Sequence, residues 1–148
     1  MRGAAVLAAA AVGLTVAWAG AAAAAEPAYN YMLRCVGCHT SAGVSPPLGR
    51  IPGLKDTVGH FARAPEGRRY LANVPGIVSA QLSPAETAAL LNWLIETYGG
   101  ASVPADYRPF TAEEVKALRS PAPDDVMRLR AAARARLAEQ GYHIDAYP

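Results

Sequence analysis

The sequence predicts an all-α protein with long loops, and three observations support this class. Residues 40–60 are rich in glycine and proline, which indicates a long irregular segment. No segment alternates convincingly between apolar and polar residues, as a half-buried strand would. Downstream of Ser83, apolar residues recur at the spacing of one helix face, and they are Leu91, Leu94, Ile95 and Tyr98.

The first 25 residues have the composition of an export signal. Arg2 supplies a minimal positive end, residues 3–25 carry no charge, and a run of alanines ends the segment. The small residues Ala23 and Ala25 fit a signal-peptidase site after position 25. The alternative is an uncleaved membrane anchor, because the uncharged stretch is long enough to span a bilayer. Cleavage is preferred, so residues 1–25 are predicted to be a signal peptide and the protein is expected in the periplasm.

Two short helices are expected in the first half of the exported chain. Residues 28–38 form the first, with Tyr31 and Met32 among its apolar contacts. Residues 66–73 form the second, which stops before Pro75-Gly76. Residues 75–81 are then expected to be a loop.

The strongest helix signal begins at Ser83. This residue is the predicted N-cap, Pro84 takes the first helical position, and Glu86 completes a capping box. Gly99-Gly100 ends the helix.

Two more helices are predicted near the C-terminus. The helix over residues 111–119 begins with a second capping box. The last helix starts at Asp124 or Asp125 and runs to Gln140, with a single narrow apolar stripe that predicts a surface position. The sequence therefore divides into a signal peptide over residues 1–25, a domain over residues 26–103 and a C-terminal helical extension over residues 104–148.

The charge pattern excludes one class of partner. The formal net charge is +2, so nothing indicates a protein that coats nucleic acid or anionic lipid. Four arginines lie on the last predicted helix, where they are expected to form a solvated face, with docking to an acidic partner as the alternative. They are Arg128, Arg130, Arg134 and Arg136.

Residues 35–39 read Cys-Val-Gly-Cys-His, which is the attachment pattern of a covalent haem. Two residues between the thiols of Cys35 and Cys38 suit addition to the two vinyl groups of one haem. The adjacent His39 then reaches the iron as its proximal ligand. The predicted cofactor is therefore one haem c, with its iron.

Three competing roles for this motif are weaker. A thioredoxin-like redox pair would need a βαβ context, which is absent from the sequence. A zinc site would need about four ligands, and only His60 and His143 remain to complete it. A disulfide between Cys35 and Cys38 would be strained and would close a very short loop.

Over residues 28–98 the chain resembles the class I cytochrome c family. The matching pieces are the Cys35–His39 motif, Pro47-Leu48-Gly49, and Leu82-Ser83-Pro84 leading into Leu90–Leu94. The resemblance implies a small helical domain around one covalent haem, with the C-terminal extension added to it. It also implies that a loop proline carbonyl accepts the proton of the second nitrogen of His39. Pro47 is the expected acceptor, and Pro52 is a rival.

The chain departs from this family at the second axial ligand. Members usually supply a methionine from the loop before the final helix, but residues 75–81 contain none. His60 is the tentative sixth ligand, because it lies at the end of the long loop and could fold over the iron. Met127, His143 and an open iron position are the alternatives.

These features predict an electron-transfer protein rather than an enzyme. Its expected partners are redox proteins, a dehydrogenase or another redox enzyme on one side and an acceptor on the other, with membrane contact only if the signal segment stays uncleaved. The alternative function is binding or sensing of a small ligand at an open sixth position. A third possibility is a subunit of a larger redox enzyme, which the extension after residue 103 suggests.

Overall fold

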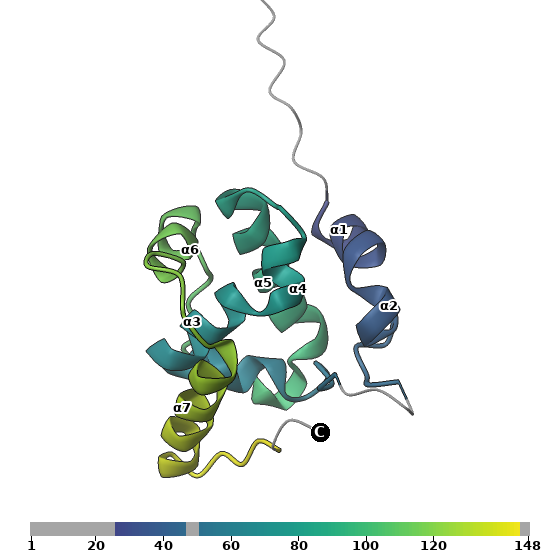
Figure 1. Ribbon diagram of the computed structural model, residues 1–148. Helices are drawn as coiled ribbons and strands as arrows, with labels where there is room; N and C mark the ends of the chain where they lie inside the picture. Colours follow the sequence, from purple (N-terminus) through teal and green to yellow (C-terminus); the bar gives the residue numbers. More distant parts are fainter. Residues whose placement is uncertain (1–25, 47–50, 146–148) are drawn as a thin grey trace, which may run out of the picture.

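The computed structural model describes residues 26–46 and 51–145, and it confirms the all-α class (Figure 1). Within these two ranges the regular elements are helices, and no strand occurs. In chain order they are α1 (Pro27–Arg34), α2 (Val36–His39), the 3-10 helix η1 (Val58–Arg63), α3 (Pro65–Asn73), α4 (Pro75–Ser79), α5 (Pro84–Tyr98), the 3-10 helix η2 (Gly100–Ser102), α6 (Ala112–Leu118) and α7 (Val126–Glu139).

The predicted starts of the three helices with capping signals are confirmed. Ser83 accepts a hydrogen bond from the backbone of Glu86, whose carboxylate in turn accepts from the Ser83 backbone, so α5 begins with a complete capping box. Thr111 accepts from the backbone of Glu114 at the start of α6. Asp125 caps α7.

Two predictions about the first half need correction. The single helix expected over residues 28–38 is two helices, because the backbone at Cys35 leaves helical geometry at φ −124°. The loop expected over residues 75–81 is wrong in its first part, which forms α4. Pro75 ends the helix before it, but it also occupies the first turn of α4, where proline is well tolerated. The expected helix over residues 66–73 is confirmed as α3.

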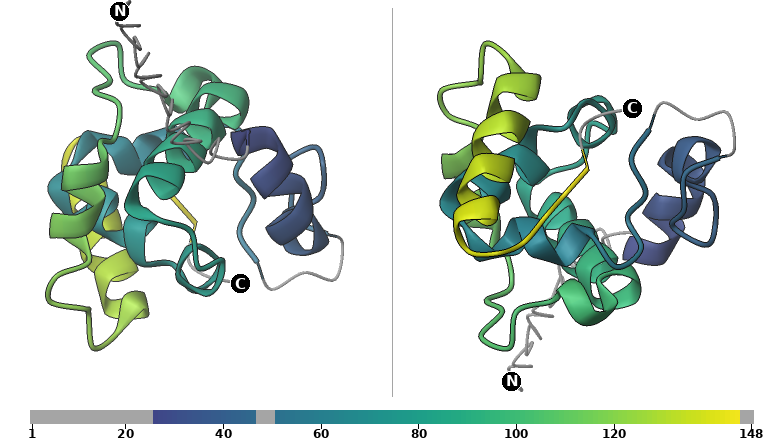
Figure 2. Two further views of the ribbon diagram at one scale, coloured as in Figure 1. Left: turned by 90° about the horizontal axis from the view of Figure 1, so that it is seen from above. Right: turned by 90° about the horizontal axis from the view of Figure 1, so that it is seen from below.

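Helix α5 lies at the centre of the hydrophobic core. Leu90 and Ile95 are fully buried on it. The α1–α2 pair packs on α5 through Tyr31, whose ring lies 5.3 Å from the rings of both Trp93 and Tyr98. In both views of Figure 2 the α1–α2 pair and α7 lie on opposite sides of the molecule, with α3, α4 and α5 between them.

The C-terminal extension packs on the preceding helices and shares their core. Helix α6 packs on α5, and α7 packs along α3. Asn92 of α5 fixes the segment before α6, since its side chain bonds both the N–H and the carbonyl of Phe110. Arg68 of α3 donates two hydrogen bonds of 2.6 Å to Glu114 of α6. The fold around α3 and α5 therefore includes residues well beyond 103.

The Arg68–Glu114 pair predicts a pH-dependent stability. Its hydrogen bonds from Arg68 lower the pKa of Glu114, although partial burial opposes this. In the unfolded chain the carboxyl of Glu114 has the ordinary glutamate pKa of about 4.3. The stabilisation of the folded state by this ion pair is therefore complete above that pH. It is lost as the pH falls through the lower pKa that Glu114 has in the folded protein. Glu114→Gln should reduce the free energy of unfolding by about 2 kcal/mol near pH 6. The measurement is urea unfolding of both proteins at a series of pH values. The difference in free energy of unfolding between the wild type and Glu114→Gln should decrease as the solution becomes acidic.

Glu113→Gln is the matched control, because Glu113 is exposed on the same turn of α6. It should change the free energy of unfolding by less than about 0.5 kcal/mol. Equal losses in the two variants, or a Glu114→Gln loss that does not vary with pH, would contradict the role given to the pair.

No helix in the two described ranges is long and apolar enough to cross a membrane. The predicted signal peptide over residues 1–25 lies outside those ranges.

Candidate functional site

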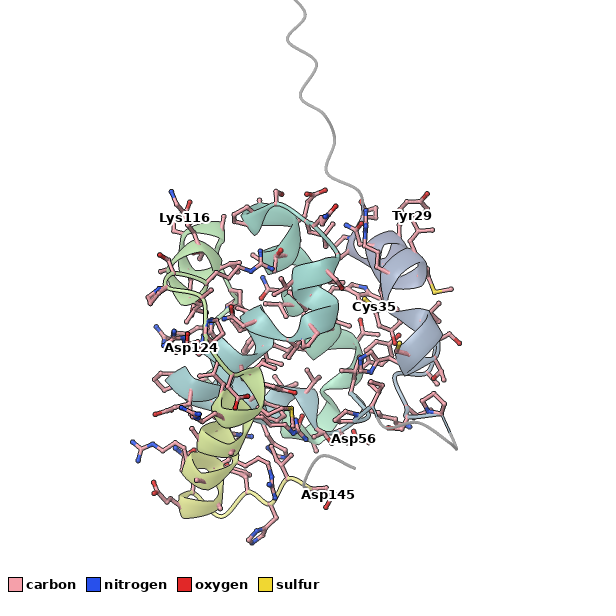
Figure 3. The ribbon with its side chains drawn as sticks, in the orientation of Figure 1. Tyr29, Cys35, Asp56, Lys116, Asp124 and Asp145 are labelled. Carbon is pink, nitrogen blue, oxygen red and sulfur yellow. The ribbon has the colours of Figure 1, made fainter. Side chains whose placement is uncertain are left out.

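The Cys-Val-Gly-Cys-His motif forms one helical turn at the junction of α1 and α2. The backbone N–H groups of Cys38 and His39 both donate to the carbonyl of Cys35 at 3.0 Å. Residues three and four apart in a helix share a face, so Cys35, Cys38 and His39 lie together. Both cysteines are free thiols; Cys35 is half-buried and Cys38 is exposed. Figure 3 shows Cys35 on the side of the α1–α2 pair that faces the rest of the molecule.

A cavity of about 420 Å³ lies against this turn. One wall carries the two cysteines and His39, together with Tyr31 and Arg34. The other walls come from η1 and the segment before it, from α3 to α5, and from the start of α7. Their side chains are mainly apolar, and they include Leu54, Val58, Phe61, Leu71, Val74, Ile77, Leu91, Leu94 and Val126.

His39 is set up to be a neutral ligand. Burial lowers its pKa, because the charged ring loses hydration, and the nearby carbonyl of Pro52 partly opposes this shift. Its Nδ1 atom is buried and forms no hydrogen bond of normal geometry. The neutral imidazole is the form that binds a metal. Pro52, the rival acceptor, lies beside this ring, whereas the expected acceptor Pro47 falls outside the described residues.

The cavity and its wall fit a haem attached through two thioethers. Its volume falls in the range of about 300–1,000 Å³ that cofactor sites occupy. Two free thiols and a histidine with a buried, incompletely bonded ring nitrogen lie on one face. The rest of the lining is predominantly apolar, as a macrocycle with a large hydrophobic area requires.

The alternative sixth ligands fall in different places. His60 lies on η1 with its ring 5.0 Å from that of Tyr142, and it is not among the residues that line the cavity. Burial and the neighbouring Arg63 lower the pKa of His60. His143 is exposed and is also absent from the lining. Met127, on the first turn of α7, lines the cavity.

Arg130 is a cavity residue that the sequence analysis missed. Only 4% of it is exposed, and its guanidinium donates to the hydroxyl of Tyr70 at 3.2 Å and to the carbonyl of Asp145. The burial of Arg130 could have been predicted from its spacing to the apolar residues of the helix. Arg130 follows Val126 by four residues and precedes Ala133 by three, so it lies on the buried face of α7.

The four arginines of α7 do not form the single solvated face that the sequence predicts. Arg130 is buried, and Arg134 is half-buried and donates to the carbonyl of Ile144. Arg128 and Arg136 are exposed, and each forms an ion pair with an acidic residue three positions away in the sequence, Asp125 and Glu139 respectively. The local charge therefore serves mainly to fix α7 and the chain that follows it.

Comparison with known proteins identifies relatives that are themselves cytochromes. No family model matches the chain. A protein named cytochrome c-552 from Thermus thermophilus is 35% identical over an alignment of 105 residues, which covers 59% of this chain and 79% of that protein. A second cytochrome c-552, from a named strain of Thermus thermophilus, has the same identity, and the alignment covers 70% of its length. This degree of identity over most of both relatives shows common descent, and the chain belongs to the cytochrome c family.

Proposed function

We propose that this protein is an exported monohaem c-type cytochrome that carries single electrons. The observation that supports it most directly is the helical turn that presents Cys35, Cys38 and His39 to one wall of an apolar cavity. The two relatives named cytochrome c-552 support the same class. The proposed export follows from the composition of residues 1–25, with the periplasm as the compartment.

Cys35 and Cys38 would hold the haem covalently, and His39 would bind its iron from the same wall. Each thiol adds across one vinyl group: the sulfur bonds to one carbon of the double bond and the hydrogen goes to the other. This addition balances without an oxidant. The bound haem supplies a one-electron couple between ferric and ferrous iron. The apolar lining would limit the access of water to that iron, and the neighbouring Pro52 carbonyl would accept from the His39 ring and orient it.

The site also suits exchange of electrons with other proteins. Cys38 is exposed, so a group attached to its sulfur begins at the protein surface. A redox partner can therefore approach without a large rearrangement of the chain. The proposed partners are an electron donor such as a dehydrogenase and a separate electron acceptor. The small net charge of +2 gives no indication of binding to nucleic acid. We assign the chain the role of a carrier rather than of an enzyme.

A spectroscopic redox titration of the exported protein tests this function. The absorption spectrum should convert reversibly between ferric and ferrous forms, and the data should fit a one-electron couple. Carbon monoxide should leave the ferrous spectrum unchanged, because in the proposed carrier protein side chains would occupy both axial positions of the iron. A haem that binds carbon monoxide readily would replace electron transfer with small-ligand binding as the function, and an irreversible titration would contradict the carrier role.

A further inference from the structure

We propose that Met127, on the C-terminal extension, is the second axial ligand of the iron. This inference rests on the proposed function, since it requires the covalent haem. The segment in which the family usually carries its methionine is residues 75–81, and most of it is the short helix α4 without a methionine. A sulfur ligand must then come from another element that reaches the same cavity.

Few of the cavity residues can bind iron, and most of these already have another role. Cys35, Cys38 and His39 belong to the attachment turn. The hydroxyl of Tyr31 donates to the carbonyl of Thr40 at 2.6 Å, and Tyr31 is fully buried. Among the described residues that line the cavity, the remaining candidates are Tyr70 and Met127.

Tyr70 is held away from ligation by its own contacts. Its hydroxyl accepts a hydrogen bond from Arg130, its ring lies 5.0 Å from that of Phe61, and only 7% of it is exposed. A tyrosine also binds iron best as the phenolate, which requires loss of the hydroxyl proton. A thioether needs no deprotonation, so Met127 is the better ligand at neutral pH.

Helix α7 holds the backbone of Met127 firmly beside the cavity. The N–H of Met127 donates to the carboxylate of Asp125 at 2.8 Å, which fixes the first turn. The preceding residue, Val126, lies beside α4, where it shares a second cavity with Pro75 and Val78. On the next turn, Arg130 also lines the main cavity and is bonded to Tyr70. The start of α7 is therefore attached to the elements that enclose the site.

The side chain of Met127 keeps the freedom that a ligand needs. It is 43% exposed, although it contributes to the lining of the cavity. Methionine has three rotatable bonds and no branch, so its sulfur can change position without moving the helix. A fixed backbone with an adjustable thioether is a suitable arrangement for binding an iron within the cavity.

Replacing Met127 by leucine tests the inference, because leucine keeps the apolar volume and removes the sulfur. The control is Met32→Leu, since Met32 is also exposed, at 52%, but lies on α1 and does not line the cavity. Haem content is measured first on all proteins, after extraction with acidified organic solvent. Each variant is then examined in the ferric state and, after reduction, with carbon monoxide.

The wild-type and Met32→Leu proteins should show a low-spin ferric haem with the weak far-red band of sulfur-bound iron, and neither should bind carbon monoxide. Met127→Leu should lose the far-red band, gain a high-spin spectrum and bind carbon monoxide, with the same covalent haem content. Met127→His should restore a low-spin spectrum without the far-red band and shift the reduction potential downward. His60→Ala should match the wild type.

Two outcomes would overturn the inference while the proposed covalent haem stands. The first is a Met127→Leu protein with covalent haem and an unchanged low-spin spectrum, in which case His60→Ala or a Tyr70→Phe variant would show the change instead. The second is a wild-type protein whose covalent haem is already high-spin and binds carbon monoxide, which would also replace the carrier role with small-ligand binding. Absence of covalent haem from the wild type would instead overturn the proposed function itself.

Discussion

Replacing Cys35 and Cys38 together by alanine is expected to leave no haem on the chain after extraction with acidified organic solvent. The two thiols lie on one helical turn at the cavity wall, and they are the proposed points of covalent attachment. His39 alone provides a coordinate bond, which acid breaks by protonating the ring. The measurement is the absorbance of haem in the protein and solvent fractions.

The single variants Cys35→Ser and Cys38→Ser separate attachment from folding. Each should keep one thioether, so haem should stay with the protein while its reduced pyridine complex shifts toward the red, because one vinyl group remains. This test stays informative even if the double variant fails to accumulate. Haem that remains bound to the double variant after extraction, or single variants with no spectral shift, would contradict attachment at these two residues.

Replacing Tyr31 by alanine should lower the free energy of unfolding by about 3–5 kcal/mol. Tyr31 is fully buried, and its ring packs at 5.3 Å from both Trp93 and Tyr98, which joins the attachment turn to the central helix α5. Its hydroxyl also donates to the carbonyl of Thr40, directly after His39. The measurement is chemical unfolding of the haem-containing protein, followed by circular dichroism.

Two further variants identify which contacts of Tyr31 account for the lost free energy of unfolding. Tyr31→Phe keeps the ring packing and removes only the hydrogen bond to Thr40, so its loss should be about 1 kcal/mol. Tyr29→Ala removes a tyrosine that is 58% exposed on the same helix and points away from the molecule (Figure 3), so it should change stability by less than about 0.5 kcal/mol. Equal losses for Tyr31→Ala and Tyr29→Ala would contradict the anchoring role of Tyr31.

The strongest local signals of the sequence predicted the helices correctly. Ser83 with Glu86 and Thr111 with Glu114 are capping signals that depend on neighbouring residues alone. The first forms its complete capping box, and in the second Thr111 caps the helix while the Glu114 carboxylate bonds Arg68. Pro75 shows the limit of such signals, because a proline that ends one helix also suits the first turn of the next. The break at Cys35 was not foreseen, since the pattern around it is compatible with one continuous helix.

The parts of the site that depend on distant contacts were predicted less well. Cys35, Cys38 and His39 are close together in sequence, so their arrangement follows from one turn of helix. Which residues face them across the cavity depends on how the extension packs, and no local pattern contains that information. Arginine is usually solvated, so Arg130 was expected at the surface, yet packing of α7 on α3 buries it.

The intact mass of the exported protein, taken after extraction with acidified organic solvent, tests the central claim most directly. The account predicts a mass that exceeds that of the polypeptide by one haem, because two thioethers would retain the cofactor through the extraction. A mass without haem, or one that includes haem only before extraction, would contradict covalent attachment at Cys35 and Cys38 and with it the proposed cytochrome.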